Sequence, residues 1–141
     1  MAIEIKGMAP LLSVFDMPMA LAFYRDILGF RVVRDSGQGD NSGWVMLDFD
    51  GTTLMLNTAY DDDERPLAPD PQHNAVHHDT CLYFACPDVD AAYKYLREKG
   101  VALKPPEIAS YGMKQLYLHD QDGYNICYQW PSETAPPSAS K

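Results

Sequence analysis

The chain has 141 residues, of which 46 % are hydrophobic and 22 % charged, a composition typical of a folded protein with a buried core. Its 20 acidic and 11 basic residues give a formal net charge of −9, which repels the phosphates of nucleic acids and the anionic surfaces of membranes. The sequence has no run of 18 apolar residues and no basic-then-apolar leader, and its three cysteines lack the spacing of a disulfide framework. We therefore expect a cytoplasmic protein with neither a nucleic-acid nor a membrane partner.

The first half of the chain predicts one strand, one helix and three further strands. An apolar strand over residues 8–15 precedes Asp16 and Pro18, which are typical of a helix start, and the apolar spacing that follows predicts a helix ended by Gly29. Alternating apolar and polar residues then predict strands over 30–35, 43–49 and 52–58, the last two joined by a tight turn at Asp50-Gly51.

The second half repeats this order after an interruption. Residues 60–79 hold four consecutive acidic residues, three prolines and three histidines without an apolar period, and we interpret them as a linker without a regular element. The pattern resumes with a helix over 88–99 that Gly100 ends. Strands are expected over 80–86, 101–104, 113–119 and 124–130. Residues 131–141 are rich in Ser, Pro and Ala and predict a disordered tail.

Two landmarks recur at an offset of 72 positions. Asp16 and Asp88 each begin a helical pattern, and the Asp-Gly pairs at 50–51 and 122–123 each precede a strand. This repetition predicts an α+β fold in which two βαβββ modules pair into a cupped mixed β-sheet, with the helices on the outer face. The expected boundaries are 1–59 for the first module, 60–79 for the linker, 80–130 for the second module and 131–141 for the tail.

Strand alternation divides each strand between a face toward the helices and an opposite face, which we call the cup face. The cup face carries aromatic, thioether, thiol and amide side chains, a mixture that suits a moderately polar organic ligand. The alternative is that this face is only the solvated side of the sheet. The expected ligand contacts on it are Trp44, Met46, Met55, Asn57, Cys81, Tyr83, Gln115, Tyr117, His119, Cys127 and Gln129.

The sequence resembles the vicinal oxygen chelate superfamily, which includes glyoxalases, extradiol dioxygenases, fosfomycin-resistance enzymes and bleomycin-resistance proteins. The resemblance spans about residues 7–130 and is specific for a fold, not for a reaction. The segments that carry it are Val14-Phe15-Asp16, residues 22–30, residues 88–101 and residues 120–125. The resemblance implies a homodimer and a loop before the seventh strand that closes over the pocket. There Tyr111 would cover a ligand, the alternative being an exposed tyrosine on a turn.

The resemblance also implies that a metal-binding member takes His, Glu or Gln ligands from the first and fourth strands of each module. The corresponding positions hold Ala9, Met55, Cys81 and Cys127. Ala9 and Met55 offer neither imidazole nor carboxylate to a hard or borderline divalent ion, so we expect no metal and no other cofactor, unless a strand register is wrong by two residues. Cys81 and Cys127 could bind a soft ion or form a disulfide, and the alternative is that both are apolar fillers.

The four histidines differ in their expected surroundings. His119 lies on the cup face with Gln115 and Tyr117, where it would donate a hydrogen bond to a ligand or act as a base; at the mouth of the following turn it could instead be solvated. The other three, in the expected linker, are predicted to be solvated: His73, His77 and His78.

These observations favour a metal-free protein of the bleomycin-resistance type, which binds an amphipathic or aromatic small molecule, over an enzyme. His119 is the residue named as a catalytic candidate. The alternative is a glyoxalase-like lyase or isomerase, or a dioxygenase-like enzyme, with atypical metal ligands, or a metal-free member that uses His119 and Tyr117 for acid–base work. A further option is an interaction module without a small-molecule ligand.

Overall fold

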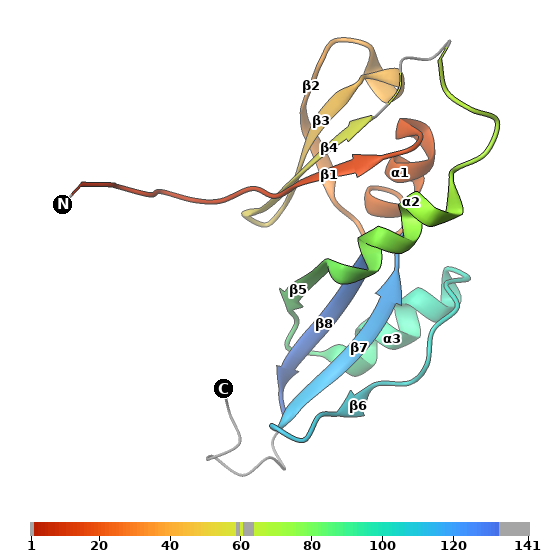
Figure 1. Ribbon diagram of the computed structural model, residues 1–141. Helices are drawn as coiled ribbons and strands as arrows, with labels where there is room; N and C mark the ends of the chain where they lie inside the picture. Colours follow the sequence, from red (N-terminus) through yellow and green to blue (C-terminus); the bar gives the residue numbers. More distant parts are fainter. Residues whose placement is uncertain (1, 59, 61–63, 133–141) are drawn as a thin grey trace. The chain divides into compact units, whose positions relative to one another are not determined.

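The computed structural model describes residues 2–58, 60 and 64–132 (Figure 1). Contacts within the chain divide it into unit 1, Met1–Pro69, and unit 2, Asp70–Lys141. Each unit contains one four-stranded mixed β-sheet. Among the described residues, no helix combines the length and the apolar character needed to cross a lipid bilayer.

Unit 1 follows a β-α-β-β-β order. Its elements are β1 (Leu11–Val14), α1 (Met17–Tyr24), β2 (Arg31–Asp35), the 3-10 turn η1 (Gly39–Asn41), β3 (Trp44–Phe49) and β4 (Thr52–Thr58). The sheet order is β1-β4-β3-β2, with β1 parallel to β4 and the other neighbours antiparallel. The helix α1 packs against β4 (Figure 1).

The core of unit 1 lies between α1 and one face of this sheet. The strand residues predicted to face the helix are buried, namely Leu12, Val14, Val45, Leu47, Leu54 and Leu56. The helix contributes Met17, Ala20, Leu21 and Tyr24, all at most 1 % exposed. Phe49, which the alternation along β3 also assigns to the side facing the helix, is 44 % exposed because it is the last residue before the hairpin turn, where its ring packs edge-on against Phe30.

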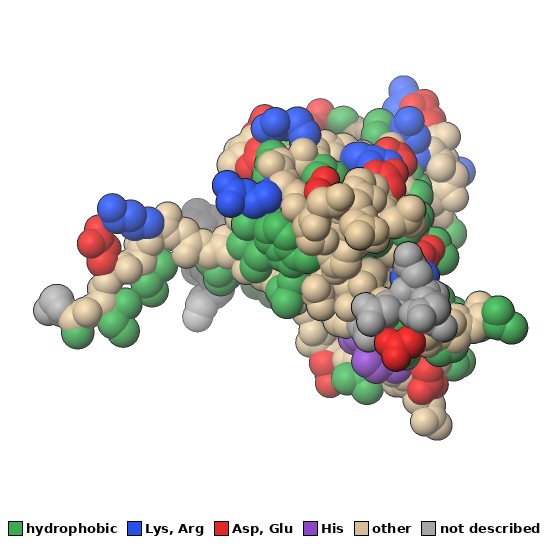
Figure 2. All heavy atoms as spheres, turned by 90° about the horizontal axis from the view of Figure 1, so that it is seen from above, with side chains coloured by type: hydrophobic (Ala, Val, Ile, Leu, Met, Phe, Trp, Pro, Cys, Tyr) green, Lys and Arg blue, Asp and Glu red, His purple; other side chains and the backbone are tan. Residues whose placement is uncertain are grey.

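The ends of the first strand and helix differ from prediction. Pro10 has no N–H to donate, so β1 starts only at Leu11, although the Pro10 carbonyl still accepts from the backbone of Met55 at 2.8 Å. Residues 2–8 precede β1 as an extended segment with exposed apolar and charged side chains (Figures 1 and 2). After Tyr24 the backbone hydrogen bonds join residues five positions apart, as where the N–H of Leu28 donates to the carbonyl of Phe23 at 2.9 Å. Gly29 then turns the chain at φ 93°.

Unit 2 repeats the β-α-β-β-β order and adds a short helix before it. Its elements are α2 (Pro71–Val76), the 3-10 turn η2 (His77–Asp79), β5 (Cys81–Ala85), α3 (Val89–Glu98), β6 (Glu107–Ile108), β7 (Met113–His119) and β8 (Asn125–Pro131). The sheet order is β5-β8-β7-β6, with β5 parallel to β8. The predicted α+β class with two βαβββ modules is thereby confirmed; their pairing into one cup stays a prediction.

The segment interpreted as a linker without a regular element contains α2 and η2. The side chain of Asp70 accepts a hydrogen bond from the backbone N–H of Gln72 at 3.0 Å, and Pro71 occupies the first helical turn, where its missing N–H costs nothing. The expectation missed this helix because it is too short to show an apolar period.

Two predicted elements near the end of the chain are also corrected. No strand forms over residues 101–104; the strand is β6 instead, since Pro105 and Pro106 lack the N–H groups that a ladder requires and pairing begins after them. Pro131, expected in the disordered tail, belongs to β8. The rest of that tail, residues 133–141, lies outside the described residues.

The two predicted Asp-Gly turns differ in kind. Phe49 pairs with Thr52, so Asp50 and Gly51 form a two-residue turn, and both have positive φ (48° and 92°). In unit 2, His119 pairs with Asn125, and the loop between them has five residues. The prediction of a tight hairpin at Asp50-Gly51 is confirmed, and Asp122-Gly123 precedes β8 as expected but within a longer loop.

Candidate functional site

The cup face of unit 2 brings seven of the predicted ligand contacts onto three neighbouring strands, with His119 as the last residue of β7. β5, β8 and β7 lie side by side, so that Cys127 on β8 is flanked by Tyr83 on one strand and by Tyr117 on the other. Gln115 and Gln129 are paired in the same way on β7 and β8. Cys81 lies two residues before Tyr83 on β5, and side chains two apart on a strand share a face.

Two tyrosines form the exposed part of this face. The hydroxyl groups of Tyr83 and Tyr117 are 3.1 Å apart, and their rings meet edge to face at a centroid distance of 6.3 Å. Tyr83 is 52 % exposed and Tyr117 46 %. The hydrogen bond to Tyr83, together with burial, raises the pKa of Tyr117 well above its usual value, so the phenol stays neutral at physiological pH. The pair therefore offers an apolar surface edged by two hydroxyl groups.

Beside the tyrosine pair, an amide network fixes three more side chains. Gln115 is buried, and its Nε2 donates to the hydroxyl of Tyr111 and to Oε1 of Gln129, both at 2.8 Å. These bonds connect Tyr111, which lies in the turn before β7, to the cup face. Because the network holds the amides in one orientation, it presents a fixed hydrogen-bonding surface.

The cup-face thiols are protonated at neutral pH. Cys127 is fully buried, and burial raises its pKa to about 11. Burial also raises the pKa of Cys81. The thiolate is the form of cysteine that binds metals and attacks disulfides, so neither side chain is activated for these reactions.

The residues at the family's metal-ligand positions do not fit a hard or borderline divalent ion. Ala9 has no donor atom, Met55 offers a thioether, and Cys81 and Cys127 are thiols with raised pKa values. Met55 lies beside Leu11 on the parallel strand, a further apolar neighbour. Within residues 2–58, 60 and 64–132, no cluster of three or more His, Cys, Asp or Glu side chains is placed to hold an ion.

The cup face of unit 1 carries the other four predicted contacts. Trp44 pairs with Asn57, and Met46 pairs with Met55, on β3 and β4. Trp44, Met46 and Met55 are half-buried, and Asn57 is exposed with its Nδ2 donating to the carbonyl of Thr58 at 3.2 Å. This face thus carries an indole and two thioethers, with one amide at its edge.

A pocket of about 510 Å³ borders β7 in unit 2. Its wall on β7 includes Gln115, Tyr117 and His119, so the structure brings the catalytic candidate His119 to the same cavity as two predicted ligand contacts. The other wall comes from Ala102, Leu103, Lys104, Pro105, Glu107, Ile108 and Ala109. The sequence interpretation missed this wall because it assigned residues 101–104 to a strand. The signal that could have revealed it is the Pro105-Pro106 pair, which is typical of a loop.

The histidines of the expected linker are not all solvated. His77 is buried, with its Nδ1 2.6 Å from the carbonyl oxygen of Asp122 and its ring stacked on Tyr124 at 4.0 Å. The prediction for His77 is therefore wrong, because η2 places its ring against the β7–β8 loop. His73 and His78 are exposed as expected, and the ring of His78 lies 5.3 Å from that of His119.

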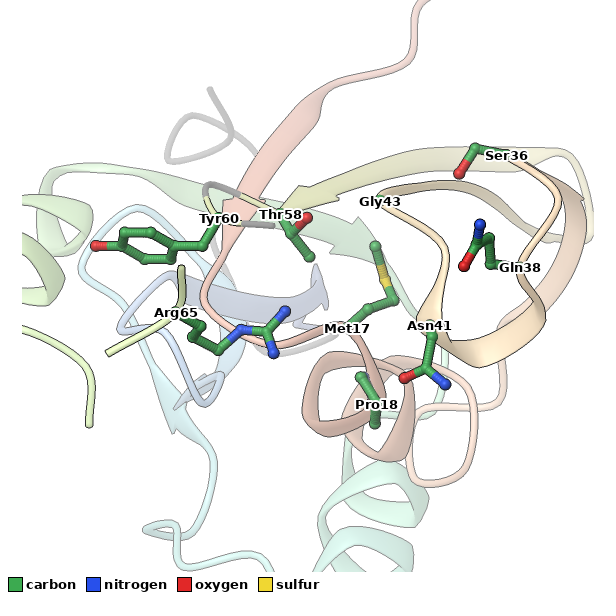
Figure 3. A pocket seen from close by; sticks show the side chains of 9 residues that line it. All are labelled: Met17, Pro18, Ser36, Gln38, Asn41, Gly43, Thr58, Tyr60 and Arg65. Carbon is green, nitrogen blue, oxygen red and sulfur yellow. The ribbon is translucent and has the colours of Figure 1, made fainter. Parts of the chain in front are cut away.

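A second pocket, of about 250 Å³, lies within unit 1 and was not anticipated from the sequence (Figure 3). It is bounded by the start of α1, the loop between β2 and β3, and the chain after β4. The residues that line it are Met17, Pro18, Ser36, Gln38, Asn41, Gly43, Thr58, Tyr60 and Arg65. They come from segments far apart in the sequence, so no local motif marks them.

Comparison with solved structures finds extensive similarity in fold. A glyoxalase/bleomycin resistance protein/dioxygenase from Nocardioides superposes with a TM-score of 0.71 at 19 % identity, covering 96 % of this chain and 90 % of that chain. A bleomycin-binding protein complexed with bleomycin gives a TM-score of 0.67 at 20 % identity, covering 91 % and 100 %. TnmS3, an antibiotic-binding protein from Streptomyces sp. CB03234, gives 0.64 at 27 % identity, covering 94 % and 99 %.

A search of curated proteins found no match. The family described as Glyoxalase/Bleomycin resistance protein/Dioxygenase superfamily matches residues 8–128, which is most of the chain. This match confirms the resemblance inferred from the sequence: the chain belongs to the Glyoxalase/Bleomycin resistance protein/Dioxygenase superfamily.

Proposed function

We propose that the protein binds a small amphipathic or aromatic molecule without a metal ion, and that the ligand lies against the cup face of unit 2. The observation that carries this proposal is the pair formed by Tyr83 and Tyr117, two half-exposed rings held together through their hydroxyl groups. Large aromatic surfaces are unfavourable in water unless something covers them. An aromatic ligand would cover these rings by stacking and would form hydrogen bonds with their hydroxyl groups.

The amides and the pocket beside β7 support the same class of ligand. A pocket of about 510 Å³ has the size of those that hold drug-sized molecules. The amides of Gln115 and Gln129 would pair with polar groups on such a molecule, and Tyr111 would cover it. We retain Cys81, His119 and Cys127 as further contacts, and Trp44, Met46, Met55 and Asn57 as contacts on the cup face of unit 1. The bleomycin-binding protein and TnmS3 among the structural relatives also favour a small-molecule ligand.

Binding can be tested by thermal shift with a panel of aromatic compounds. A specific ligand at about 100 times its dissociation constant should add about 2.7 kcal/mol to the free energy of unfolding. Tyr117→Ala should remove this stabilisation, and Tyr117→Phe, which keeps the ring, should retain most of it. Tyr95→Ala is the matched control because Tyr95 is similarly exposed but lies on α3. Equal loss of stabilisation in the Tyr95 and Tyr117 variants would contradict the proposed site.

The metal-free part of the proposal has a separate test. We expect elemental analysis of protein purified without a histidine tag to give less than about a tenth of an equivalent of zinc, manganese, iron, nickel or cobalt. A stoichiometric ion would instead favour the alternative of a metal-dependent lyase, isomerase or dioxygenase. Replacing Cys81 and His119 in turn would then show which side chain holds the ion.

We further propose that the protein is a cytoplasmic homodimer. Strand β1 is an edge of its sheet, and the exposed segment before it carries Ile3, Ile5 and Met8 at 82 %, 78 % and 83 % exposure. Unpaired edges and exposed apolar side chains favour association with a second copy. Size-exclusion chromatography with light scattering should give twice the mass of the 15.8 kDa chain. A monomer at all concentrations tested would contradict this part of the proposal without affecting the site in unit 2.

A further inference from the structure

The pocket of unit 1 differs in chemistry from the cup faces. Six of its nine lining residues have polar side chains, and neither the tyrosine pair nor any predicted ligand contact contributes to it. Figure 3 shows the guanidinium group of Arg65 entering from one side, with the amides of Gln38 and Asn41 on the other. Such a lining suits a ligand that forms many hydrogen bonds and has little apolar surface.

The loop that carries the two amides is held in place on both sides. Arg25 forms a two-pronged contact with Asp40, with nitrogen-to-oxygen distances of 2.9 and 3.1 Å, and this contact fastens η1 to the residue that follows α1. Ser42 is fully buried, and its hydroxyl oxygen accepts from the backbone N–H of Gln38 at 3.0 Å. The pocket wall is therefore ordered before any ligand arrives, which lowers the entropic cost of binding.

The electrostatics of this pocket favour a neutral ligand. Among the described residues that line it, Arg65 alone is charged, and its Nη1 lies 3.7 Å from Oδ1 of Asp16, which offsets the positive charge. Nε of Arg65 donates to the carbonyl of Phe15 at 2.8 Å, so the guanidinium group has a fixed orientation. Asp40 is paired with Arg25. With the nearby charges balanced in this way, an anion or a cation would gain little over a neutral molecule.

The residues that line this pocket can both donate and accept hydrogen bonds. The side-chain amides of Gln38 and Asn41 make no hydrogen bond to any other residue in the described part of the chain, and each offers donors and an acceptor. Ser36, Thr58 and Tyr60 add hydroxyl groups to the same lining. The apolar portion of the lining consists of Met17, Pro18 and the ring of Tyr60.

We propose that this pocket binds a small, neutral, polyhydroxylated ring of the size of a monosaccharide. Adjacent hydroxyl groups of such a ring both donate and accept, which matches the exposed amides of Gln38 and Asn41, and its C–H faces would lie against Tyr60 and Met17. The volume of about 250 Å³ is slightly below that of pockets for drug-sized molecules, so it suits a single ring. This site goes beyond the proposed cup-face ligand and does not depend on it.

Side-chain amide signals in nitrogen–proton correlation spectra give a direct test. The probes are methyl α-D-glucopyranoside, D-galactose and N-acetyl-D-glucosamine, with sodium phosphate and sodium acetate as charged comparators, each to about 100 mM, which would saturate a site whose dissociation constant is about 1 mM. At least one sugar should shift the amides of Gln38 and Asn41 saturably, while the exposed amide of Gln72, in unit 2, should not move. No saturable shift with any sugar, or saturable shifts only with phosphate or acetate, would overturn the proposal.

Variants separate binding from folding. Gln38→Ala and Asn41→Ala should each weaken the binding of the active sugar about fivefold, which corresponds to the loss of one hydrogen bond. Gln72→Ala, an exposed amide in unit 2, should leave it unchanged. Asp40→Asn removes the charge that holds the loop and should also weaken binding, although Asp40 does not line the pocket. Unchanged affinity in both the Gln38 and Asn41 variants would overturn the assignment even if a sugar binds.

Discussion

Unit 1 and unit 2 share one architecture, and the places where they differ account for their separate chemistry. The offset of 72 holds in the helices, where Met17 and Tyr24 are buried in α1 and Val89 and Leu96 in α3. It also holds where the first and fourth strands of each unit meet, since Leu11 pairs with Met55 and Tyr83 with Cys127. The repeat therefore preserves the packing between helix and sheet.

The third strand departs from this offset by one residue. Met46 pairs with Met55, whereas the neighbour of Cys127 on β7 is Tyr117, at an offset of 71. The longer loop between β7 and β8 accounts for the change, because it moves the pairing along one strand relative to the other. Cup-face chemistry follows from this register: thioethers pair in unit 1, and a tyrosine lies beside a buried thiol in unit 2.

The largest test of the shared architecture is removal of an equivalent core side chain from each unit. Tyr24→Ala should lower the free energy of unfolding by about 3–5 kcal/mol, and Leu96→Ala by about 2–5 kcal/mol, since both side chains are at most 2 % exposed. Urea denaturation followed by circular dichroism measures both. Met19→Ala, at an exposed position of α1, should change the free energy of unfolding by less than about 0.5 kcal/mol. A loss below about 1 kcal/mol for Tyr24→Ala would contradict the equivalence.

The two Asp-Gly pairs provide a sharper contrast. Gly51 and Gly123 have nearly equal φ, 92° and 88°, but a Cβ at Gly51 would meet no atom within 4 Å, whereas one at Gly123 would lie 2.6 Å from the carbonyl oxygen of Asn74. Gly51→Ala should cost about 1–2 kcal/mol from left-handed backbone strain alone. Gly123→Ala should cost about 1–3 kcal/mol more, because α2 must move away from the loop.

The same denaturation measurements decide this comparison. Equal losses for the two alanine variants would show that α2 does not pack closely on the β7–β8 loop in solution. Ala75→Gly provides a control on α2 itself, since it weakens the short helix without creating a clash. Ala75→Gly should lower the free energy of unfolding by less than Gly123→Ala does.

The packing of helix against sheet was predictable because the local periodicity of apolar residues determines which face of each element is buried. The alternation of Val45 and Leu47, and the helical spacing of Ala20, Leu21 and Tyr24, each assign a buried face without knowledge of the partner element. The helix α2 was not predictable in this way, since its position depends on a distant loop. The backbone of Asn74 in α2 lies against that loop, and the adjacent η2 contacts it through the Nδ1 of His77.

The candidate site was likewise predictable only where local periodicity determines it. Alternation predicted that Gln115, Tyr117 and Gln129 share a face, and the strand register confirms that they do. The hydrogen bonds of Gln115 to Tyr111 and Gln129 depend on rotamers that no spacing encodes. The pocket of unit 1 could not be predicted, because Arg65 reaches the start of α1 from about 50 residues away in the sequence.

A smaller effect is expected from the histidine that fastens η2 to the β7–β8 loop. His77→Ala removes the contact with the carbonyl of Asp122 and the stacking on Tyr124, and should lower the free energy of unfolding by about 1–3 kcal/mol. His78→Ala, at an exposed position, should cost less than about 0.5 kcal/mol. Equal effects of the two variants in urea denaturation would mean that the ring of His77 is not buried in solution.

The smallest expected effect is the acid sensitivity of unit 1. Hydrogen bonds from Arg25 lower the pKa values of Asp26 and Asp40 below their ordinary value of 3.8. A carboxyl with a lowered pKa in the folded state contributes stability above its unfolded pKa and loses it as the pH falls through the folded pKa. The difference in urea midpoint between the wild type and Asp40→Asn should thus be constant above about pH 5 and disappear toward about pH 2. A difference that persists at the lowest pH would show that Asp40 does not act through its charge in holding the loop that lines the pocket of unit 1.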